Sequence, residues 1–289
     1  MSKRRLDIVG AGRVGKTLAR LWKEHAAFEI GDVVNRSPES SKQAIAFIGG
    51  GTVGQIDQIN VLMISTVDSA LADCVVALAK TASIGPESVV FHCSGSISSE
   101  ILAPLRARGA SIASMHPVKS FADESLAVES FPGTFCALEG DSTAVQVLTE
   151  AVDAIGGKTF TIAPAAKAVY HAGSVFSNNY LVSTVAAGID CLVEAGIARA
   201  TALEILKPIA TEALENLFRL GPVQALTGPI SRGETKVVET QLLALQAWDP
   251  EIAASYASLG RLAARLALQN GRASKESIRQ IEEVLARSI

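Results

Sequence analysis

The chain has little of several features that mark common classes of protein. Aromatic residues make up 5% of its 289 residues, and there are only four cysteines. The cysteines are far apart, with no C-x-x-C pair, so we expect reduced thiols in a cytoplasmic protein rather than a disulfide framework. A net charge of −3, without any basic cluster, argues against a nucleic-acid partner. No apolar run approaches the roughly 18–20 residues of a membrane span, so we expect no membrane association.

Metal ligands are also scarce. The four histidines are scattered, and no set of His, Cys and carboxylate residues has the spacing of a metal site, so we expect none. Apolar residues, by contrast, are abundant: 48% of the chain is hydrophobic and the mean hydropathy is +0.31. Such a chain can bury a large core, and its length predicts two domains.

The pattern of the first half predicts an α/β domain over residues 1–162. Short β-type runs alternate with helical patterns there, as in βαβ units, which predicts a Rossmann domain with a mostly parallel, doubly wound sheet. After Pro164 only helical patterns remain, at about 165–195, 199–219, 232–246, 250–270 and 274–287. They predict an all-α domain over 163–289. The strands are expected at Leu6–Gly10, Glu29–Asn35, Asn60–Ser65, Ser88–His92, Ser111–Met115, Thr134–Leu138 and Lys158–Ile162.

A glycine motif follows the first predicted strand. Gly10, Gly12 and Gly15 have G-x-G-x-x-G spacing between a strand and an amphipathic helix, which is the context of a dinucleotide-binding turn. The first glycine permits the turn, the second lets the backbone approach a pyrophosphate, and the third lets helix and strand pack closely. Arg13 and Val14 complete the turn at the helix N-terminus, where free N–H groups favour phosphate. A second cluster, at residues 49–54, follows a helix and is interpreted as its C-terminal turn.

The end of the second strand indicates the cofactor. NAD-binding folds usually place Asp or Glu there, whereas this chain has Asn35, Arg36 and Ser37. A guanidinium attracts the 2′-phosphate of NADP(H) and a carboxylate repels it, so we predict NADP(H), with Arg13 adding charge on the same side. The alternative, that this segment merely caps the next helix, stays open.

Two further strand ends supply candidate cofactor contacts. Thr66 and Val67 follow the third strand, and Ser94 and Gly95 follow the fourth, at the edge where open α/β sheets bind ligands. Ser94 could equally be a helix cap. His116 ends the next strand near the same edge and is a candidate for substrate binding.

A polar stripe runs along the first helix of the second domain. Lys167, His171, Ser174 and Asn178 are separated by steps of 4, 3 and 4 residues, which places them on one face of an otherwise apolar helix that we expect to be buried. Lys167 is the candidate general acid/base, His171 its assistant and Asn178 the residue that orients the substrate, with Ser174 beside them. A solvated helix face is the alternative.

A Gly-Pro turn provides the last candidate site. Thr227 and Arg232 flank it at a helix start, where an arginine and free N–H groups would hold a carboxylate or phosphate. A simple cap and turn explains the composition equally well.

Together these motifs carry a family resemblance. The glycine turn, Asn35-Arg36-Ser37, the segment 116–121, Lys167-x-x-Tyr170-His171, Asn178-Asn179-Tyr180 and the segment 227–233 resemble, in order, the Rossmann-like bacterial oxidoreductases whose C-terminal helical domain is of unknown function. That family is similar to the 6-phosphogluconate dehydrogenase and ketopantoate reductase superfamily. The resemblance implies an NADP domain, a helical domain like that of 6-phosphogluconate dehydrogenase, and a homodimer. His171 stands where the hydroxyacid and ketopantoate branches have Asn, so the resemblance does not carry the substrate over.

The combined prediction is an NADP(H)-dependent oxidoreductase that transfers hydride between nicotinamide and a small, anionic carbonyl or hydroxy compound, with a ketopantoate-like 2-oxo acid as the best single substrate. The alternatives are an imine reductase, a deazaflavin-linked NADP reductase, and a non-catalytic NADP-binding sensor or scaffold.

Overall fold

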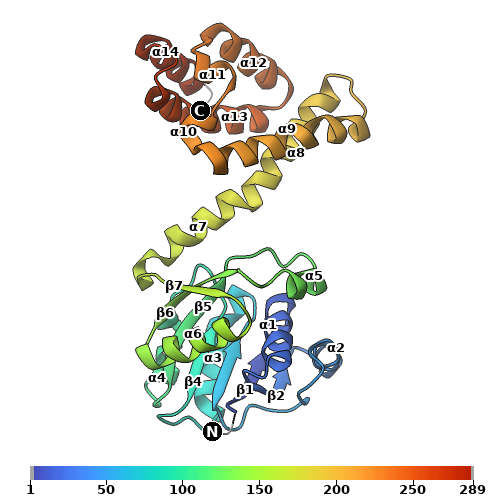
Figure 1. Cartoon of the computed structure of the whole chain (residues 1–289), viewed down its shortest axis with the longest axis vertical. Coiled ribbons are helices and arrows are strands. Elements are labelled where there is room, and N and C mark those ends of the chain that lie inside the picture. Colours follow the sequence, from blue (N-terminus) through green and yellow to red (C-terminus); the bar gives the residue numbers. More distant parts are fainter. Residues whose placement is uncertain (1–2, 288–289) are drawn as a thin grey trace. The chain divides into compact units, whose positions relative to one another are not determined.

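A seven-stranded sheet forms the first half of the chain. The computed structural model describes residues 3–287, and its strands have the order β2-β1-β3-β4-β5-β6-β7 (Figure 1). β1 to β5 are parallel, β6 runs antiparallel to β5, and β7 is parallel to β6. The strands are β1 (Arg5–Val9), β2 (Glu29–Val34), β3 (Val61–Ile64), β4 (Val89–His92), β5 (Ser111–Pro117), β6 (Phe135–Gly140) and β7 (Lys158–Thr161).

Helices cover both faces of this sheet. One face packs against α1 (Arg13–Glu24), α2 (Pro38–Ile48) and α6 (Ser142–Ala154). The other packs against α3 (Asp68–Thr81), the 3-10 turn η1 (Ser99–Leu102) and α4 (Ala103–Arg106). Alternate residues of a strand point to opposite faces, so Val61 and Met63 of β3 enter the first core and Leu62 and Ile64 the second. The remaining helix of this half, α5 (Glu124–Glu129), contacts α1.

The second half is helical. It contains α8 (Asn179–Glu194), α9 (Arg199–Leu220), α10 (Pro222–Ala225), α11 (Gly228–Arg232), α12 (Thr235–Trp248), α13 (Pro250–Asn270) and α14 (Lys275–Ala286). Val238 and Leu242 of α12, alanines of α13 and apolar residues of α14 form one core. The small alanines let helices approach closely, and Gly260 of α13 leaves room for Leu285.

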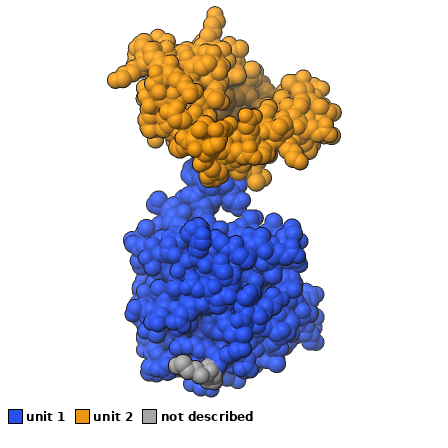
Figure 2. Space-filling model, viewed as in Figure 1, with its two compact units in different colours: residues 1–179 blue, residues 180–289 orange. Residues whose placement is uncertain are grey.

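The chain divides into two compact units, residues 1–179 and 180–289 (Figure 2). The turn η2 (Pro164–Ala166) and helix α7 (Lys167–Ser177) are thereby counted with the sheet, because the first turn of α7 packs against it. The division follows the end of α7, whereas the sequence predicts a domain boundary near residue 162, at the end of the last strand. That boundary stays a prediction about which segments fold together.

The fold class predicted from the sequence is confirmed, with a mostly parallel Rossmann-type sheet followed by helices. The second glycine cluster ends α2, with Gly49 in the left-handed region at φ 75°. The predicted helix over 165–195 needs correction, and residues 99–108 are not one continuous helix either. Residues 99–108 form a 3-10 turn and one short helix, because Pro104 lacks the N–H that a continuous helix needs. The segment 165–195 is broken at Asn178, which leaves helical geometry at φ −119° and ψ −69°.

Candidate active site

The glycine turn has the geometry that phosphate binding requires. Gly10 has φ +83°, and a Cβ there would lie 2.7 Å from the backbone nitrogen of Thr66. A Cβ on Gly15 would overlap the hydroxyl of Ser65, so this glycine lets α1 pack onto the strand. A Cβ on Gly12, however, would meet nothing within 4 Å, and Gly12 is the N-cap of α1 without a capping side chain. The N–H of Gly12 donates to the carbonyl oxygen of Gly10 (2.8 Å), so the backbone N–H groups at the start of α1, those of Arg13 and Val14, are the ones open to an anion.

The segment after β2 supports the turn and leaves one cation free. Asn35 accepts a hydrogen bond from the backbone N–H of Ala11 (2.6 Å), so its side chain ties β2 to the glycine turn. Ser37 caps α2 by accepting from the N–H of Ser40, as its alternative role in the sequence predicts. Within residues 3–287, Arg36 is exposed and has no ion-pair partner. These residues fit a 2′-phosphate, because the guanidinium and the Ser37 O–H remain available.

Two more strand ends lie along the same edge. Thr66 borders Gly10, and Val67, the N-cap before α3, has 57% of its surface exposed. Ser94 accepts hydrogen bonds from the N–H groups of Ser96 and Ile97, so its hydroxyl organises the turn after β4. The apolar and small side chains at this edge leave a surface on which the flat face of a planar ring could pack.

A polar row crosses the buried sheet next to this turn. His92 of β4 pairs with Ser114 of β5, and Ser114 pairs with Glu139 of β6. All three side chains therefore share the face of the sheet that η1 covers. Ser99 of η1 donates its N–H and its O–H to the two oxygens of Glu139, each at 2.6 Å. The row thus places a carboxylate, 3% exposed, inside an apolar sheet.

Lys167 inserts its ammonium into this row. Its Nζ donates to the carbonyl oxygen of Ser94 (2.8 Å) and to the hydroxyl of Ser114, and it lies 3.8 Å from Glu139 Oε1. The side chain is 2% exposed. Burial lowers the pKa of Lys167 below its usual range, and the charge of Glu139 opposes that change. The ammonium therefore anchors the turn after β4 by its hydrogen bond to the Ser94 carbonyl oxygen.

Two histidines and a tyrosine lie above the same turn. His116 Nδ1 is 2.8 Å from the hydroxyl of Tyr170, and its ring packs edge-to-face on His171, with centroids 5.5 Å apart. A Cβ on Gly95 would overlap the ring of His171 and lie 2.8 Å from His116 Nε2, so only glycine leaves space here. Burial, together with the charges of His171 and Lys167, lowers the pKa of His116 to about 4. These residues form the candidate active site.

The structure separates the predicted stripe into two parts. Lys167 and His171 contact the sheet unit, whereas Ser174 is half-buried and Asn178, at the end of α7, is exposed. The expectation of a buried helix is wrong, since Val169 is 79% and Phe176 55% exposed. Only the first turn of α7 lies against the strands, so its apolar side finds no cover within the sheet unit.

The second predicted substrate cluster lies in the helical unit. Thr227 is the N-cap of α11, whose five residues end at Arg232. The guanidinium of Arg232 forms two hydrogen bonds to the carboxylate of Glu234, at 2.7 and 3.0 Å. An anionic ligand would compete with Glu234 for this arginine.

Sequence reasoning missed several members of the site. Tyr170 enters the sequence prediction only as part of a family motif, and His92, Ser99, Ser114 and Glu139 are absent from it. A polar residue within an otherwise apolar strand, such as Glu139 in Cys136-Ala-Leu-Glu-Gly140, was the available signal.

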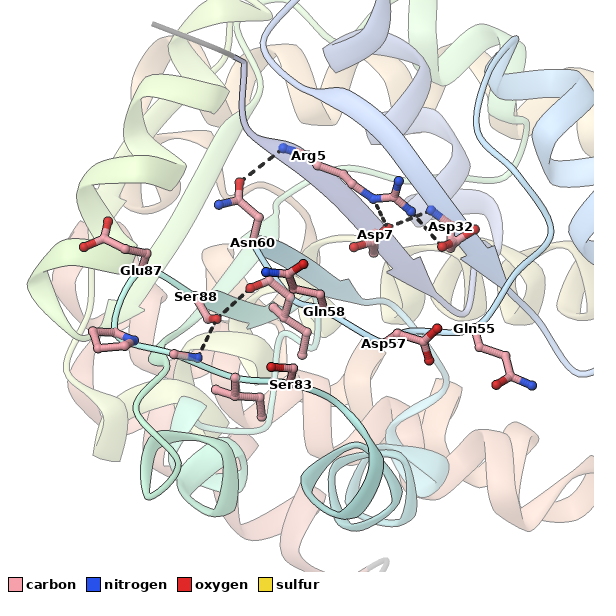
Figure 3. A pocket seen from close by; sticks show the side chains of 14 residues that line it. Arg5, Asp7, Asp32, Gln55, Asp57, Gln58, Asn60, Ser83, Glu87 and Ser88 are labelled. Carbon is pink, nitrogen blue, oxygen red and sulfur yellow. Dashed lines mark hydrogen bonds and ion pairs between the residues drawn. The ribbon is translucent and has the colours of Figure 1, made fainter.

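A pocket of about 650 Å³ lies at the opposite edge of the sheet, at the amino ends of β1, β3 and β4 (Figure 3). Arg5 sits between Asp7 (3.0 Å) and Asp32 (2.7 Å) there, so the carboxylates nearest the strands are already paired. The residues described, 3–287, include no group of three or more His, Cys, Asp or Glu side chains that could hold a metal. None of the helices in that range has the length and hydropathy to cross a membrane.

Family models match the two halves of the chain separately. Residues 1–117 match a Rossmann-like domain, and residues 134–263 match a domain of unknown function, DUF2520. The predicted resemblance is thereby confirmed. The DUF2520 segment begins at β6, so it includes Glu139, Lys167, Tyr170 and His171, while the Rossmann-like segment includes the glycine turn and His116.

Solved structures share this fold over almost the whole chain. Protein TM1727 from Thermotoga maritima is 23% identical, with 92% of this chain and 100% of that chain covered and a TM-score of 0.71. The reductive aminase from Aspergillus terreus, in complex with NADPH and ethyl-5-oxohexanoate, is 14% identical over 99% and 94% of the chains, with a TM-score of 0.59. A pyrroline-5-carboxylate reductase from Coxiella burnetii is 12% identical over 98% and 99%, also at 0.59. A comparison with curated proteins finds no match.

Proposed function

We propose that the protein is an NADP(H)-dependent oxidoreductase acting on a small compound with a polarised C=O or C=N bond. The observation that carries this proposal is the placement of two imidazoles and a phenol at the Ser94–Gly95 turn, on the same sheet edge as a glycine turn open to phosphate. Proton-transfer groups and a dinucleotide turn at one edge suit hydride chemistry. One of the similar reductases of known structure, the reductive aminase, is described as a complex with NADPH, which agrees with this cofactor.

The cofactor contacts follow from the open positions of the turn. The backbone of Gly12 to Gly15 would hold the pyrophosphate, and Arg36 with Ser37 the 2′-phosphate, with Arg13 adding positive charge. Bound NADPH would supply the hydride. Thr66, Val67, Ser94 and Gly95 would line the remainder of its site.

The proton chemistry divides between two residues. As a general acid, Lys167 would have to leave its bonds to Ser94 and Ser114, whereas His171 is half-buried at the surface of the turn. We therefore assign proton transfer to His171 and the positioning of the turn to Lys167. Ser174 and Asn178 on the same helix, with Thr227 and Arg232 of the helical unit, remain proposed substrate contacts.

A competition between nucleotides tests the cofactor assignment. Fluorescence titration should show NADPH binding at least tenfold more tightly than NADH, and Arg36→Ala should remove most of that preference, because the 2′-phosphate loses its cation. The exposed Arg265 of the helical unit, changed to Ala, is the matched control. Tighter binding of NADH would refute the assignment.

The substrate class divides into two candidates. A 2-oxo acid such as a ketopantoate-like compound agrees with Arg232 as an anion contact. An imine is favoured by Asp68, whose carboxylate accepts from the Ser96 hydroxyl (2.8 Å) and adds negative charge to a turn where Glu139 already offsets Lys167. Screening 2-oxo acids and cyclic imines for NADPH oxidation separates them, and Asp68→Asn should impair only the turnover of imines. If neither class oxidises NADPH, the sensor or scaffold hypothesis is favoured.

The homodimer is also proposed. Apolar side chains of the helical unit are exposed, including Phe218 (86%), Val182 (67%) and Ile209 (59%), and a second copy packed on them would remove them from water. A cytoplasmic location is proposed with it, because the four cysteines are free thiols. Light scattering after size exclusion should give twice the mass of one chain.

A further inference from the structure

Tyr170 is held in one orientation beside His116. Its hydroxyl lies 2.8 Å from His116 Nδ1, and its ring packs edge-to-face on His116 and on Phe160 of β7, with centroids 5.7 and 6.0 Å away. Phe135 of β6 supports Phe160 in the same way. Rings packed on both sides restrict rotation of the phenol, so the hydroxyl stays on Nδ1.

The Tyr170 hydroxyl has no other hydrogen-bond partner among the described residues, so the direction that uses its proton is donation to His116 Nδ1. Burial raises the pKa of Tyr170 to about 12, so the phenol keeps its proton at neutral pH. The pKa of His116 is lowered to about 4, so its imidazole is neutral and carries one N–H and one acceptor nitrogen. A phenol O–H that donates to Nδ1 leaves the imidazole proton on Nε2.

The Nε2 atom lies over the turn after β4. It would be 2.8 Å from a Cβ on Gly95, and the ring of His171 reaches the same point. The charged and titratable groups that act on His116 are His171 and Lys167 of α7 and Asp68 of α3. Lys167 is bonded beneath the turn, so the space above Gly95 is bordered by His116 Nε2 and by His171.

We propose that Tyr170 is a positioning residue that keeps His116 in the Nε2–H tautomer, so that His116 presents a neutral hydrogen-bond donor above Gly95. Such a donor polarises the oxygen of a C=O or the nitrogen of a C=N without giving up its proton, which leaves proton transfer to His171. The substrate must accordingly offer an acceptor atom to Nε2. This last step rests on the proposed function, whereas the tautomer rests on the hydrogen bond between Tyr170 and His116 and on the neutral state of both side chains.

Nitrogen NMR of the ring atoms tests the tautomer on the full chain without cofactor. The chain has only four histidines, and His116→Asn identifies the signals of His116 by their loss. We expect Nδ1 of His116 to have the shift of an unprotonated nitrogen and Nε2 that of a protonated one. Tyr170→Phe removes one hydrogen bond, about 1 kcal/mol, and should shift the tautomer ratio by about fivefold towards Nδ1–H.

The control is Tyr256→Phe, which removes a hydroxyl bonded to Gln241 (2.7 Å) in the helical unit and should leave the His116 signals unchanged. A proton on Nδ1 in the unmodified protein, or a ratio unaffected by Tyr170→Phe, would overturn the proposal. With an active substrate, Tyr170→Phe should lower kcat severalfold and leave the Kd for NADPH unchanged. Absence of any NADPH oxidation would count against the proposed function only, since the NMR result does not depend on it.

Discussion

The buried pair of Lys167 and Glu139 offers a quantitative test of the site. Lys167→Met leaves a carboxylate that is 3% exposed without its counter-charge. Breaking a buried pair in this way costs about 3–5 kcal/mol. Ser99 still donates two hydrogen bonds to Glu139, so the expected loss is about 3 kcal/mol, the lower end of that range. The exposed Lys80→Met in α3 should change stability by less than about 0.5 kcal/mol.

The double variant Lys167→Met/Glu139→Gln separates charge from packing. It removes both charges and nearly preserves volume, so its cost should be smaller than the sum of the single variants by about 1–3 kcal/mol. Denaturant unfolding followed by Trp22, which is buried in the sheet unit, measures this in a Trp248→Phe background, so that fluorescence reports one unit. The pairing would be refuted if the losses of stability of the two single variants summed to that of the double variant within about 0.5 kcal/mol. It would also be refuted if Lys167→Met were as stable as the parent protein.

Three further outcomes are expected. Gly15→Ala should destabilise the protein by about 1–3 kcal/mol, measured as a lower Tm, because its Cβ overlaps the Ser65 hydroxyl. Gly12→Ala should leave Tm unchanged, because its Cβ would meet no protein atom. The same Cβ should weaken NADPH binding in titration, because it would stand where the pyrophosphate approaches the backbone. Equal losses of stability in Gly12→Ala and Gly15→Ala would contradict these two roles. The pKa of His92 is lowered to about 4 by burial, and the unfolded chain binds its proton near 6.5, so the free energy of unfolding should fall as pH drops from 6.5 towards 4, by up to about 3 kcal/mol. His116, whose pKa is lowered in the same way, adds a similar fall, so His92→Gln should remove about half of the total slope, and an equally steep slope in that variant would assign the dependence elsewhere.

Much of the sheet could be predicted because its central strands are buried on both faces. Short apolar runs such as Val61–Ile64 and Val89–His92 stand out against amphipathic helices, and all seven strands lie where those runs predict them. The antiparallel direction of β6, by contrast, could not be predicted. An antiparallel strand at this position has the same local pattern as a parallel one, so the sequence carries no sign of it.

The stripe on α7 shows where periodicity stops being informative. Steps of 3 and 4 residues correctly place Lys167 and His171 on one face, but they do not reveal that the helix breaks before Asn179 or that its apolar side is exposed. Burial depends on what the helix packs against. Only the contacts of its first turn, to Ser94 and Ser114, decide that Lys167 is buried while Asn178 is not.

Glu139 could not be assigned from the sequence for a related reason. Its role depends on the register of three strands, which aligns it with Ser114 and His92, and on η1, which brings Ser99 over the same face. Each of these residues is unremarkable within its own segment. Lys167, which begins α7 28 positions later, completes the pair with Glu139. It also binds the turn after β4, where Gly95 lies next to His116 and His171. The antiparallel strand β6 thereby connects the charge inside the sheet with the groups above it, which is why the pair and the imidazoles should respond to mutation as one site.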